Sequence, residues 1–483
     1  MIRRCLLFAI ILSVACRVQG QDSHYWTQQY GTKSMLLSGS VIGGVEDLGA
    51  VYYNPARLAT IENPAFLLSA NVYEYSTISV ADAFGNAKNS SKSTLKGVPT
   101  LAAGTFKIKK WPKHHFAYAI LTRQNSDFSF GYRDEVYKDV FTTLPGNEYF
   151  GAEISLNGTS TEQWTGLTWA YSLTPKLSVG VTTNYVINSQ SRNNLINLQA
   201  MSAANEVAVY RYNRAYDYKE TGFLWKVALA SELGKWKLGL TMTTPMISLT
   251  GNGNYRYEEF YSTIPGLGPK PEVYASTYQK GLPISTRSPF SVGFGATRNI
   301  GKNKLHLSTE WFQAINKYTV MTAADFPSQS IPDSINSFRL TDKVKSVWNF
   351  GVGAEIYINP QISGFLSFSS DFSAAQSDLV RFSERSPEAS NSTWNADFYH
   401  VGGGFVLDFK WADLTLGATH TGAQQTIPRP VNFPEKAGDK IFGTGDTADV
   451  TWDRWRFVFS FSFPFLKEYA KKLEEKGSKK DDK

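Results

Sequence analysis

The sequence predicts an all-β fold: a closed antiparallel transmembrane β-barrel of about 14 strands, with an N-terminal hatch (plug) segment inside its lumen. Three observations predict it. Large apolar side chains recur with a two-residue period in many segments. Short turns alternate with long connections, and the chain opens with a segment typical of exported proteins.

The first 20 residues have the layout of a cleavable secretory signal. Arg3 and Arg4 precede an apolar run over residues 6–14, and small or polar residues follow up to Gly20. The apolar run is shorter than the ~20 residues that a membrane-spanning helix needs. We therefore expect a mature chain that begins near residue 21.

Both cysteines, Cys5 and Cys16, lie inside this signal. Cleavage after Gly20 leaves a mature chain without thiols, so neither disulfides nor cysteine–metal sites are expected. The alternative is a lipoprotein signal ending at Cys16, which fits less well because Ser13 stands where an aliphatic residue is expected.

Composition is compatible with a barrel and excludes a helical membrane protein. Mean hydropathy is −0.27, and a membrane barrel scores as mildly polar because its lumen face offsets its lipid face. The formal net charge of +7 lies partly in the signal and in the tail from Lys467. Nucleic-acid binding is therefore not implied.

The clearest strand is the stretch 455–465. Successive side chains of a strand point to opposite faces, so every second residue shares a face. Six aromatics fall on one face here: Trp455, Phe457, Phe459, Phe461, Phe463 and Phe465. Water does not tolerate such a face, and its recurrence along the chain favours lipid as the solvent.

The same period predicts fourteen strands over the chain. They are residues 66–80, 100–110, 114–131, 160–173, 176–190, 217–232, 235–250, 287–299, 302–316, 345–358, 361–374, 394–409, 411–423 and 452–465. Tight turns alternate with long connections of roughly 20 to 35 residues, which is typical of an outer-membrane barrel with periplasmic termini.

Inward-facing glycines form a second pattern. By strand parity they are Gly293, Gly295, Gly351, Gly353, Gly402 and Gly404. They make room for a segment filling the lumen, or they allow the strands to curve; the pattern is equally compatible with both.

Residues 21–63 lack strand periodicity and are expected to fold inward as the hatch. They contain Asn54, Pro55 and Ala56 with Leu58 after them, preceded by an Ala-Val-Tyr-Tyr run and a Gly/acidic stretch at 43–47. This hatch motif resembles that of the FadL/TodX family of outer-membrane transporters for hydrophobic compounds.

The resemblance implies passive uptake of long-chain fatty acids or aromatic hydrocarbons through a plugged barrel, with lateral release through the wall. The expected partners are a hydrophobic small molecule, outer-membrane lipid and lipopolysaccharide, and the barrel-assembly machinery during biogenesis, for a monomer that binds no nucleic acid. The alternative is a PorV-like shuttle of a protein secretion system, which shares the hatch motif and carries proteins.

Two loops are candidates for capture of the ligand. In the first, apolar residues near helical spacing predict an amphipathic segment; in the second, aromatics are dense. The candidates are Leu195, Ile196, Leu198, Met201, Phe260, Tyr261, Ile264, Leu267 and Tyr274. The alternative is that the two loops pack on each other as a lid.

Lys226, His400 and Arg456 face the lumen by parity and are candidates for contact with a polar ligand group. A cation beside an apolar pocket pairs with a carboxylate. The alternative is ordinary charge pairing across the barrel.

No enzyme motif is found, and no catalytic residue, metal or cofactor is expected. The predicted organisation is a signal peptide over 1–20, a hatch over 21–63, a barrel over 64–466 and a charged periplasmic tail over 467–483.

Overall fold

The computed structural model describes residues 23–61, 66–68, 72–83, 85, 89–97, 100–106, 108, 110–263, 272–376, 382, 385–392, 395–409, 413–429, 431–441 and 445–462. The N-terminal segment carries three short helices: α2 (Lys33–Leu36), α3 (Ala50–Tyr53) and the 3₁₀ helix η1 (Pro55–Ala59). All other elements are strands.

The main sheet contains eighteen strands. They are β1 (Phe66–Leu68), β2 (Val72–Ala81), β3 (Ser90–Gly97), β4 (Leu101–Phe106), β5 (His114–Lys138), β6 (Glu148–Thr174), β7 (Leu177–Met201), β8 (Val207–Leu233), β9 (Trp236–Thr243), β10 (Ile247–Ser262), β11 (Val273–Pro283), β12 (Ser291–Ile300), β13 (Asn303–Phe312), β16 (Val347–Asn359), β17 (Ile362–Asp371), β19 (Phe398–Asp408), β20 (Asp413–Pro428) and β21 (Thr447–Ser462). A smaller sheet contains β14 (Ile315–Pro327), β15 (Ile335–Val344) and β18 (Glu388–Ser390).

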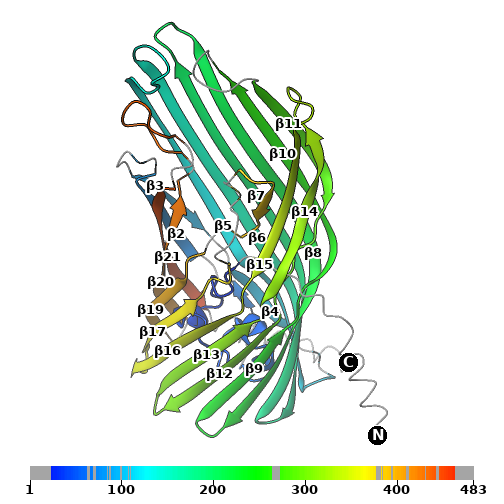
Figure 1. The fold of residues 1–483 in the computed structure, drawn as a ribbon. Helices are drawn as coiled ribbons and strands as arrows, with labels where there is room; N and C mark the ends of the chain where they lie inside the picture. The colour runs from blue at the N-terminus through cyan, green and yellow to red at the C-terminus, as the bar shows by residue number, and fades with distance from the viewer. Residues whose placement is uncertain are drawn as a thin grey trace, which may run out of the picture.

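The main sheet is antiparallel throughout and curves around the N-terminal segment (Figure 1). From β4 to β8 each strand pairs with the next in the chain, and the same holds from β19 to β21. The last strand, β21, then pairs with β2 near the start of the chain, with Trp455 opposite Tyr75. An all-β architecture built on a large antiparallel sheet is therefore confirmed.

The two faces of β21 differ as the two-residue period predicts. Trp455, Phe457 and Phe459 are 44%, 47% and 43% exposed on the outer face. Arg456 and Val458, on the opposite face, are buried. Within the part of the chain that the structure describes, no second protein layer covers these three outer rings. Phe463 and Phe465 lie outside the described residues.

Strands β5 to β8 are longer than predicted, with 25, 27, 25 and 27 residues. The prediction of long loops over 132–159 and 191–216 is therefore wrong. The two-residue period continues there, but the faces exchange character: Tyr212 and Tyr216 point inward and are buried, while Asp217 points outward and is exposed. The prediction ended these strands too early, because it required an apolar outward face and the outer face becomes polar there.

The inner face of these upper strand halves packs on the small sheet. The Tyr255 ring stacks on Phe338, with centroids 4.3 Å apart, and Tyr216 meets Phe382 edge-on at 4.9 Å. The upper interior thus holds a hydrophobic cluster rich in aromatics, which we call the aromatic cluster and which includes Tyr212, Tyr216, Tyr255 and Phe338. The strand halves that carry it extend above the N-terminal segment in Figure 1.

Candidate functional site

The hatch motif joins the N-terminal segment to the wall. Asn54 caps η1, because its side-chain oxygen accepts a hydrogen bond from Ala56 N at 3.1 Å. Its amide nitrogen donates to Ile42 O at 2.8 Å and to Leu229 O, on β8, at 3.4 Å. Pro55 occupies the first helical turn, where its missing N–H has no cost. Asn54 therefore holds two parts of the N-terminal segment together and against β8.

Asp47 organises the preceding turn. Its carboxylate accepts hydrogen bonds from Thr32 N, Ser34 N and Gly49 N at 2.9, 3.0 and 2.9 Å, and from the Ser34 hydroxyl at 2.9 Å. Asp47, the second acidic residue of the Gly/acidic stretch, is therefore a structural hydrogen-bond acceptor that closes the loop over 31–49.

Replacing Asp47 by alanine is expected to loosen this loop. Hydrogen bonds to a charged group contribute ~1.5–3 kcal/mol each, and the donors left behind are partly buried. We expect a loss of about 3 kcal/mol in local stability, which is a roughly 100-fold faster amide exchange over residues 30–50 by hydrogen–deuterium exchange. Asp47→Asn keeps an acceptor oxygen and should show a smaller effect; equal exchange in both variants would contradict this role.

The inward glycines accommodate the N-terminal segment. A Cβ at Gly295 would lie 2.4 Å from Gly43 N, and one at Gly351 would lie 2.6 Å from the Ser40 hydroxyl. Gly353 and Gly402 meet Leu37 and Ser38 in the same way. Of the two explanations for the glycine pattern, this close approach supports the one in which glycines make room for a filled interior.

Arg456 forms a polar latch on residues 24–29, and His400 lies beside it, with its Nε2 3.9 Å from Asp371. Arg456 donates to Glu74 at 2.9 Å, and also to Thr27 O and to Gln29 at 3.1 Å each. His400 donates to or accepts from Thr421 at 2.8 Å. In this state both candidates therefore support the fold.

Asp371 completes the latch from β17. Its carboxylate accepts hydrogen bonds from Tyr25 N at 2.9 Å and Trp26 N at 3.0 Å, and from the Thr27 hydroxyl at 2.8 Å. Sequence reasoning missed Asp371, because its partners lie more than 340 residues away.

Lys226 is the lumen candidate with a different environment. Its ammonium lies 4.6 Å from the centroid of the Tyr52 ring, an arrangement that stabilises a cation. Among the described residues, no carboxylate pairs with it. The nearby Glu310 is already bonded by Trp26 Nε1 at 2.8 Å and by the Ser291 hydroxyl at 2.7 Å.

A small cavity lies between the N-terminal segment and the wall at this point. Lys226, Tyr52, Trp26 and Gln28 are among its lining residues, and its volume is about 10 Å³. That is about the space of one water molecule. Both polar atoms of the Gln28 side chain are buried there without a hydrogen-bond partner in the described chain. The cavity is thus closed to any organic ligand until the N-terminal segment moves.

Aromatic rings connect this cavity to the wall. The Tyr52 ring lies 4.4 Å from Tyr30 and 5.8 Å from Trp164, centroid to centroid. The Tyr30 hydroxyl donates to Thr122 O on β5 at 3.1 Å. Sequence reasoning did not single out Tyr52 as a site residue. It belongs to the Ala-Val-Tyr-Tyr run, and this run is the sequence feature from which it could have been predicted.

Strand pairing changes on β5 at this level. Below it, β5 pairs with β4 up to Leu101 opposite Leu121, and a bulge follows between Thr122 and Gln124. Within the described ranges, β5 above the bulge pairs only with β6, and β3 pairs only with β2. One ion pair bridges the two unpaired edges, Lys96 Nζ to Asp127 Oδ2 at 2.5 Å.

Glu46 clamps the lower side of the N-terminal segment. Its carboxylate lies 3.0 Å from Lys237 Nζ and 2.7 Å from Lys304 Nζ, and its side chain is 32% exposed. Partial burial raises the pKa of Glu46, but Lys304 and Lys237 outweigh it and lower the pKa to about 2.

The clamp is expected to resist acid. Because the folded-state pKa of Glu46 is depressed, its contribution to stability is fully present above the ordinary carboxyl pKa of 4.5 and is lost progressively as pH falls from about 5 to about 2. Amide exchange over residues 41–49, corrected for intrinsic rates, should therefore be unchanged between pH 7 and about pH 5.5. Glu46→Gln should exchange faster at every pH in this range. Loosening of the wild type at about pH 6 would contradict the assignment.

The proposed capture residues lie on strands. Leu195, Ile196, Leu198 and Met201 belong to β7, so the expectation of helical spacing is wrong. The strand alternation buries Ile196 and Leu198 on the inner face, in the aromatic cluster. The first candidate set is thus split between two faces.

The second set is also divided. Phe260 and Tyr261 lie on β10 and Tyr274 lies on β11, with Phe260 and Tyr274 opposite each other and exposed on the outer face. Ile264 and Leu267 lie outside the described residues.

In the described part of the chain, no helix has the length and apolar character to span a bilayer. The same residues hold no group of three or more His, Cys, Asp or Glu side chains placed to bind a metal ion.

No protein-family model matches the sequence, and no curated protein matches it. Among solved structures, the chain is similar to a FadL homologue from Pseudomonas aeruginosa (TM-score 0.45, 11% identity, 90% of this chain and 99% of that one). It is also similar to the toluene transporter TodX from P. putida (TM-score 0.49, 10% identity, 90% and 98%) and to the toluene transporter TbuX from Ralstonia pickettii (TM-score 0.38, 10% identity, 92% and 100%). At these identities and TM-scores, function has to be inferred from the residues of this chain.

Proposed function

We propose that this chain is an outer-membrane β-barrel transporter for passive uptake of hydrophobic carboxylates such as long-chain fatty acids, with lateral release through the wall. The observation that carries the proposal is the closed cavity between the N-terminal segment and the wall, where the Lys226 ammonium is buried beside Tyr52 without a carboxylate partner in the described chain. Glu310 also lines the cavity, but its carboxylate is already bonded to Trp26 and Ser291. A buried cation that no carboxylate contacts directly is costly, and a ligand carboxylate relieves that cost.

The barrel itself is part of the proposal. In six places we count two strands that follow each other in the chain as one interrupted crossing of the barrel wall. These are β1 and β2, β3 and β4, β9 and β10, β11 and β12, β13 and β14, and β15 and β16. Counting each pair as one traverse, and leaving out β18, reduces the twenty-one strands to fourteen traverses. The pairing of β21 with β2 supports closure, which removes the free sheet edges that lipid cannot solvate.

The outer face supports placement in a bilayer. Outward residues of the lower strand halves are large, apolar and exposed: Leu167, Val227, Leu240, Phe294, Phe350, Leu366 and Val401. They come from β6, β8, β9, β12, β16, β17 and β19, which lie around the sheet, and a patch this extended has to be covered by lipid. We assign residues 21–63 to a hatch, 64–466 to the barrel and 467–483 to a periplasmic tail, in a monomer that contacts lipopolysaccharide and depends on the barrel-assembly machinery.

The path supports a hydrophobic ligand. The aromatic cluster of the upper interior, including Tyr212, Tyr255 and Phe338, lies above the hatch. The hatch occupies the middle, and Tyr30 and Tyr52 join the Lys226 cavity to the bulge on β5. We place lateral release between β3 and β5, because the described edges there have no strand pairing with each other and the half-exposed Lys96–Asp127 ion pair spans them.

Uptake by cells tests the function. Cells lacking their own uptake route should take up labelled oleate faster when they express the chain, and only if the chain reaches the outer membrane. Labelled toluene distinguishes a carboxylate transporter from a general hydrocarbon channel. The PorV-like shuttle would be favoured instead if expression left oleate uptake unchanged and deletion of the gene in the native host abolished the secretion of cargo proteins.

A further inference from the structure

The outer face of the long strands changes from apolar to polar at one level. On β7, outward Ile187 is followed by Ser189, Ser191 and Asn193. At ~3.3 Å per residue, Ser191 lies about 13 Å along the strand from Ile187. The upper strand halves therefore project a polar outer face directly above the apolar belt.

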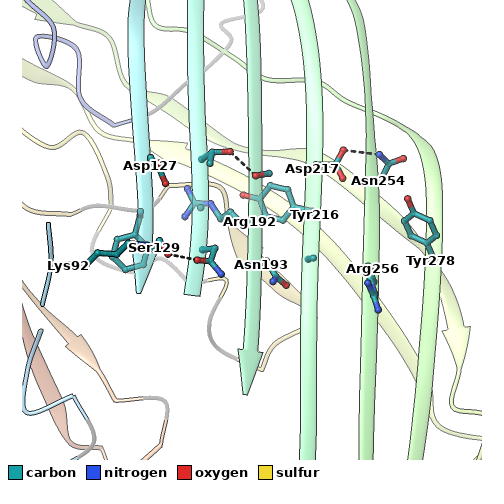
Figure 2. A pocket seen from close by; sticks show the side chains of 16 residues that line it. Lys92, Asp127, Ser129, Arg192, Asn193, Tyr216, Asp217, Asn254, Arg256 and Tyr278 are labelled. Atoms are coloured by element: carbon teal, nitrogen blue, oxygen red, sulfur yellow. Dashed lines mark hydrogen bonds between the residues drawn. The ribbon is translucent and has the colours of Figure 1, made fainter. Parts of the chain in front are cut away.

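A groove crosses this polar face. Its volume is about 850 Å³, and it runs from Lys92 at the edge of β3 across β5, β6, β7, β8 and β10 to Tyr278 on β11 (Figure 2). Thirteen of its sixteen lining residues carry a hydroxyl, amide, carboxylate or cationic group, two of them as tyrosines; the exceptions are Phe128, Gly158 and Ala215.

Cross-strand hydrogen bonds hold the floor of the groove in place (Figure 2). The Ser129 hydroxyl donates to Asn157 Oδ1 at 2.7 Å, and the Thr159 and Ser191 hydroxyls lie 2.8 Å apart. Asn254 and Asp217 form a third such pair at 2.8 Å. The floor is thus an ordered array of polar groups on adjacent strands, which are spaced by ~4.8 Å.

Other groups in the groove remain available to a ligand. Among the described residues, no hydrogen bond or ion pair engages the Lys92 ammonium or the Asn193 amide. Arg256 contacts only Glu258, at 3.3 Å, and is 56% exposed. The Tyr278 ring, 61% exposed, lies at one end.

This chemistry fits a phosphorylated saccharide. Amides and hydroxyls both donate to and accept from sugar hydroxyls. Cations pair with phosphate, and an exposed tyrosine ring offers an apolar face with a polar edge. A phospholipid head group would fill only a small part of about 850 Å³.

We propose that the groove binds the phosphorylated inner saccharide of outer-leaflet lipopolysaccharide. This inference rests on the proposed function, because the groove reaches the saccharide layer only if the apolar belt lies in the outer membrane. Continuity of the groove with that belt points to one occupant: a molecule whose acyl chains cover the belt and whose sugar phosphates lie immediately above it.

Binding to the full-length protein in detergent tests the proposal. The probe is lipopolysaccharide truncated after its inner core, measured by native mass spectrometry. The double variant Lys92→Gln, Arg256→Gln is expected to bind about ten-fold more weakly, since two phosphate contacts are lost. Enzymatically dephosphorylated lipopolysaccharide should bind the wild type equally weakly.

Arg133→Gln is the matched control. Arg133 is also 56% exposed on the outer face and also pairs with the acid two residues later, Glu135, but it does not line the groove. The affinity of the Arg133→Gln variant for the truncated lipopolysaccharide should stay within two-fold of the wild-type affinity. An equal loss in Arg133→Gln, or wild-type affinity no higher than for phosphatidylglycerol, would overturn the proposal.

The two proposals fail separately. Lipopolysaccharide binding without oleate uptake would contradict the proposed transport function and would support the assignment of the groove. Oleate uptake without specific lipopolysaccharide binding would do the reverse.

Discussion

Cross-linking Lys96→Cys to Asp127→Cys with a short bis-maleimide is expected to lower oleate uptake to the level of cells without the protein. The reason is that the two positions face each other across the described edges of β3 and β5, which have no strand pairing between them. A covalent bridge there prevents the two edges from separating, so a ligand that leaves through the wall is trapped. Uptake of labelled oleate before and after cross-linking is the measurement.

The sequence makes this experiment clean, because its natural cysteines are Cys5 and Cys16, both inside the predicted signal. The matched control places the same cross-link between Thr161→Cys and Ser189→Cys, which lie opposite each other on the paired strands β6 and β7 and do not line the polar groove. That bridge joins edges that are already hydrogen-bonded and should leave uptake unchanged. If both bridges leave uptake unchanged, the exit does not lie between β3 and β5.

Replacing Lys226 by methionine is expected to raise the half-saturating oleate concentration by roughly 10- to 100-fold. A charge-assisted hydrogen bond contributes ~1.5–3 kcal/mol, and each 1.4 kcal/mol corresponds to a factor of ten. Methionine keeps the unbranched stem, so packing against Tyr52 should survive. Toluene has no carboxylate, so any toluene uptake should change less than two-fold.

Lys219→Met is the control for this variant. Lys219 lies on the same strand but is exposed, on the outer face, and its loss should leave both substrates unaffected. A Lys226→Met variant that keeps wild-type oleate uptake would contradict the anchor. Equal losses for oleate and toluene would indicate that Lys226 supports the hatch instead.

Pattern alone was sufficient for the strands that face an apolar solvent. In β21 the aromatic alternation of Trp455, Phe457 and Phe459 specifies both faces, because a strand has only two faces and a one-residue slip would bury the wrong one. The same logic failed for the upper halves of β5 to β8. There the two-residue period persists, but the outer face becomes polar. Alternation alone does not show which of the two faces points outward.

The sequence by itself determined the class of fold and the inward glycines, since both depend on local geometry or on neighbours a few residues apart. Only the tertiary structure decided which inward cations are neutralised. Arg456 meets Glu74 across 382 residues, whereas Lys226 contacts the Tyr52 ring and forms no ion pair among the described residues. Charge pairing depends on distance in space, and strand parity reports only the side of the wall on which a residue lies.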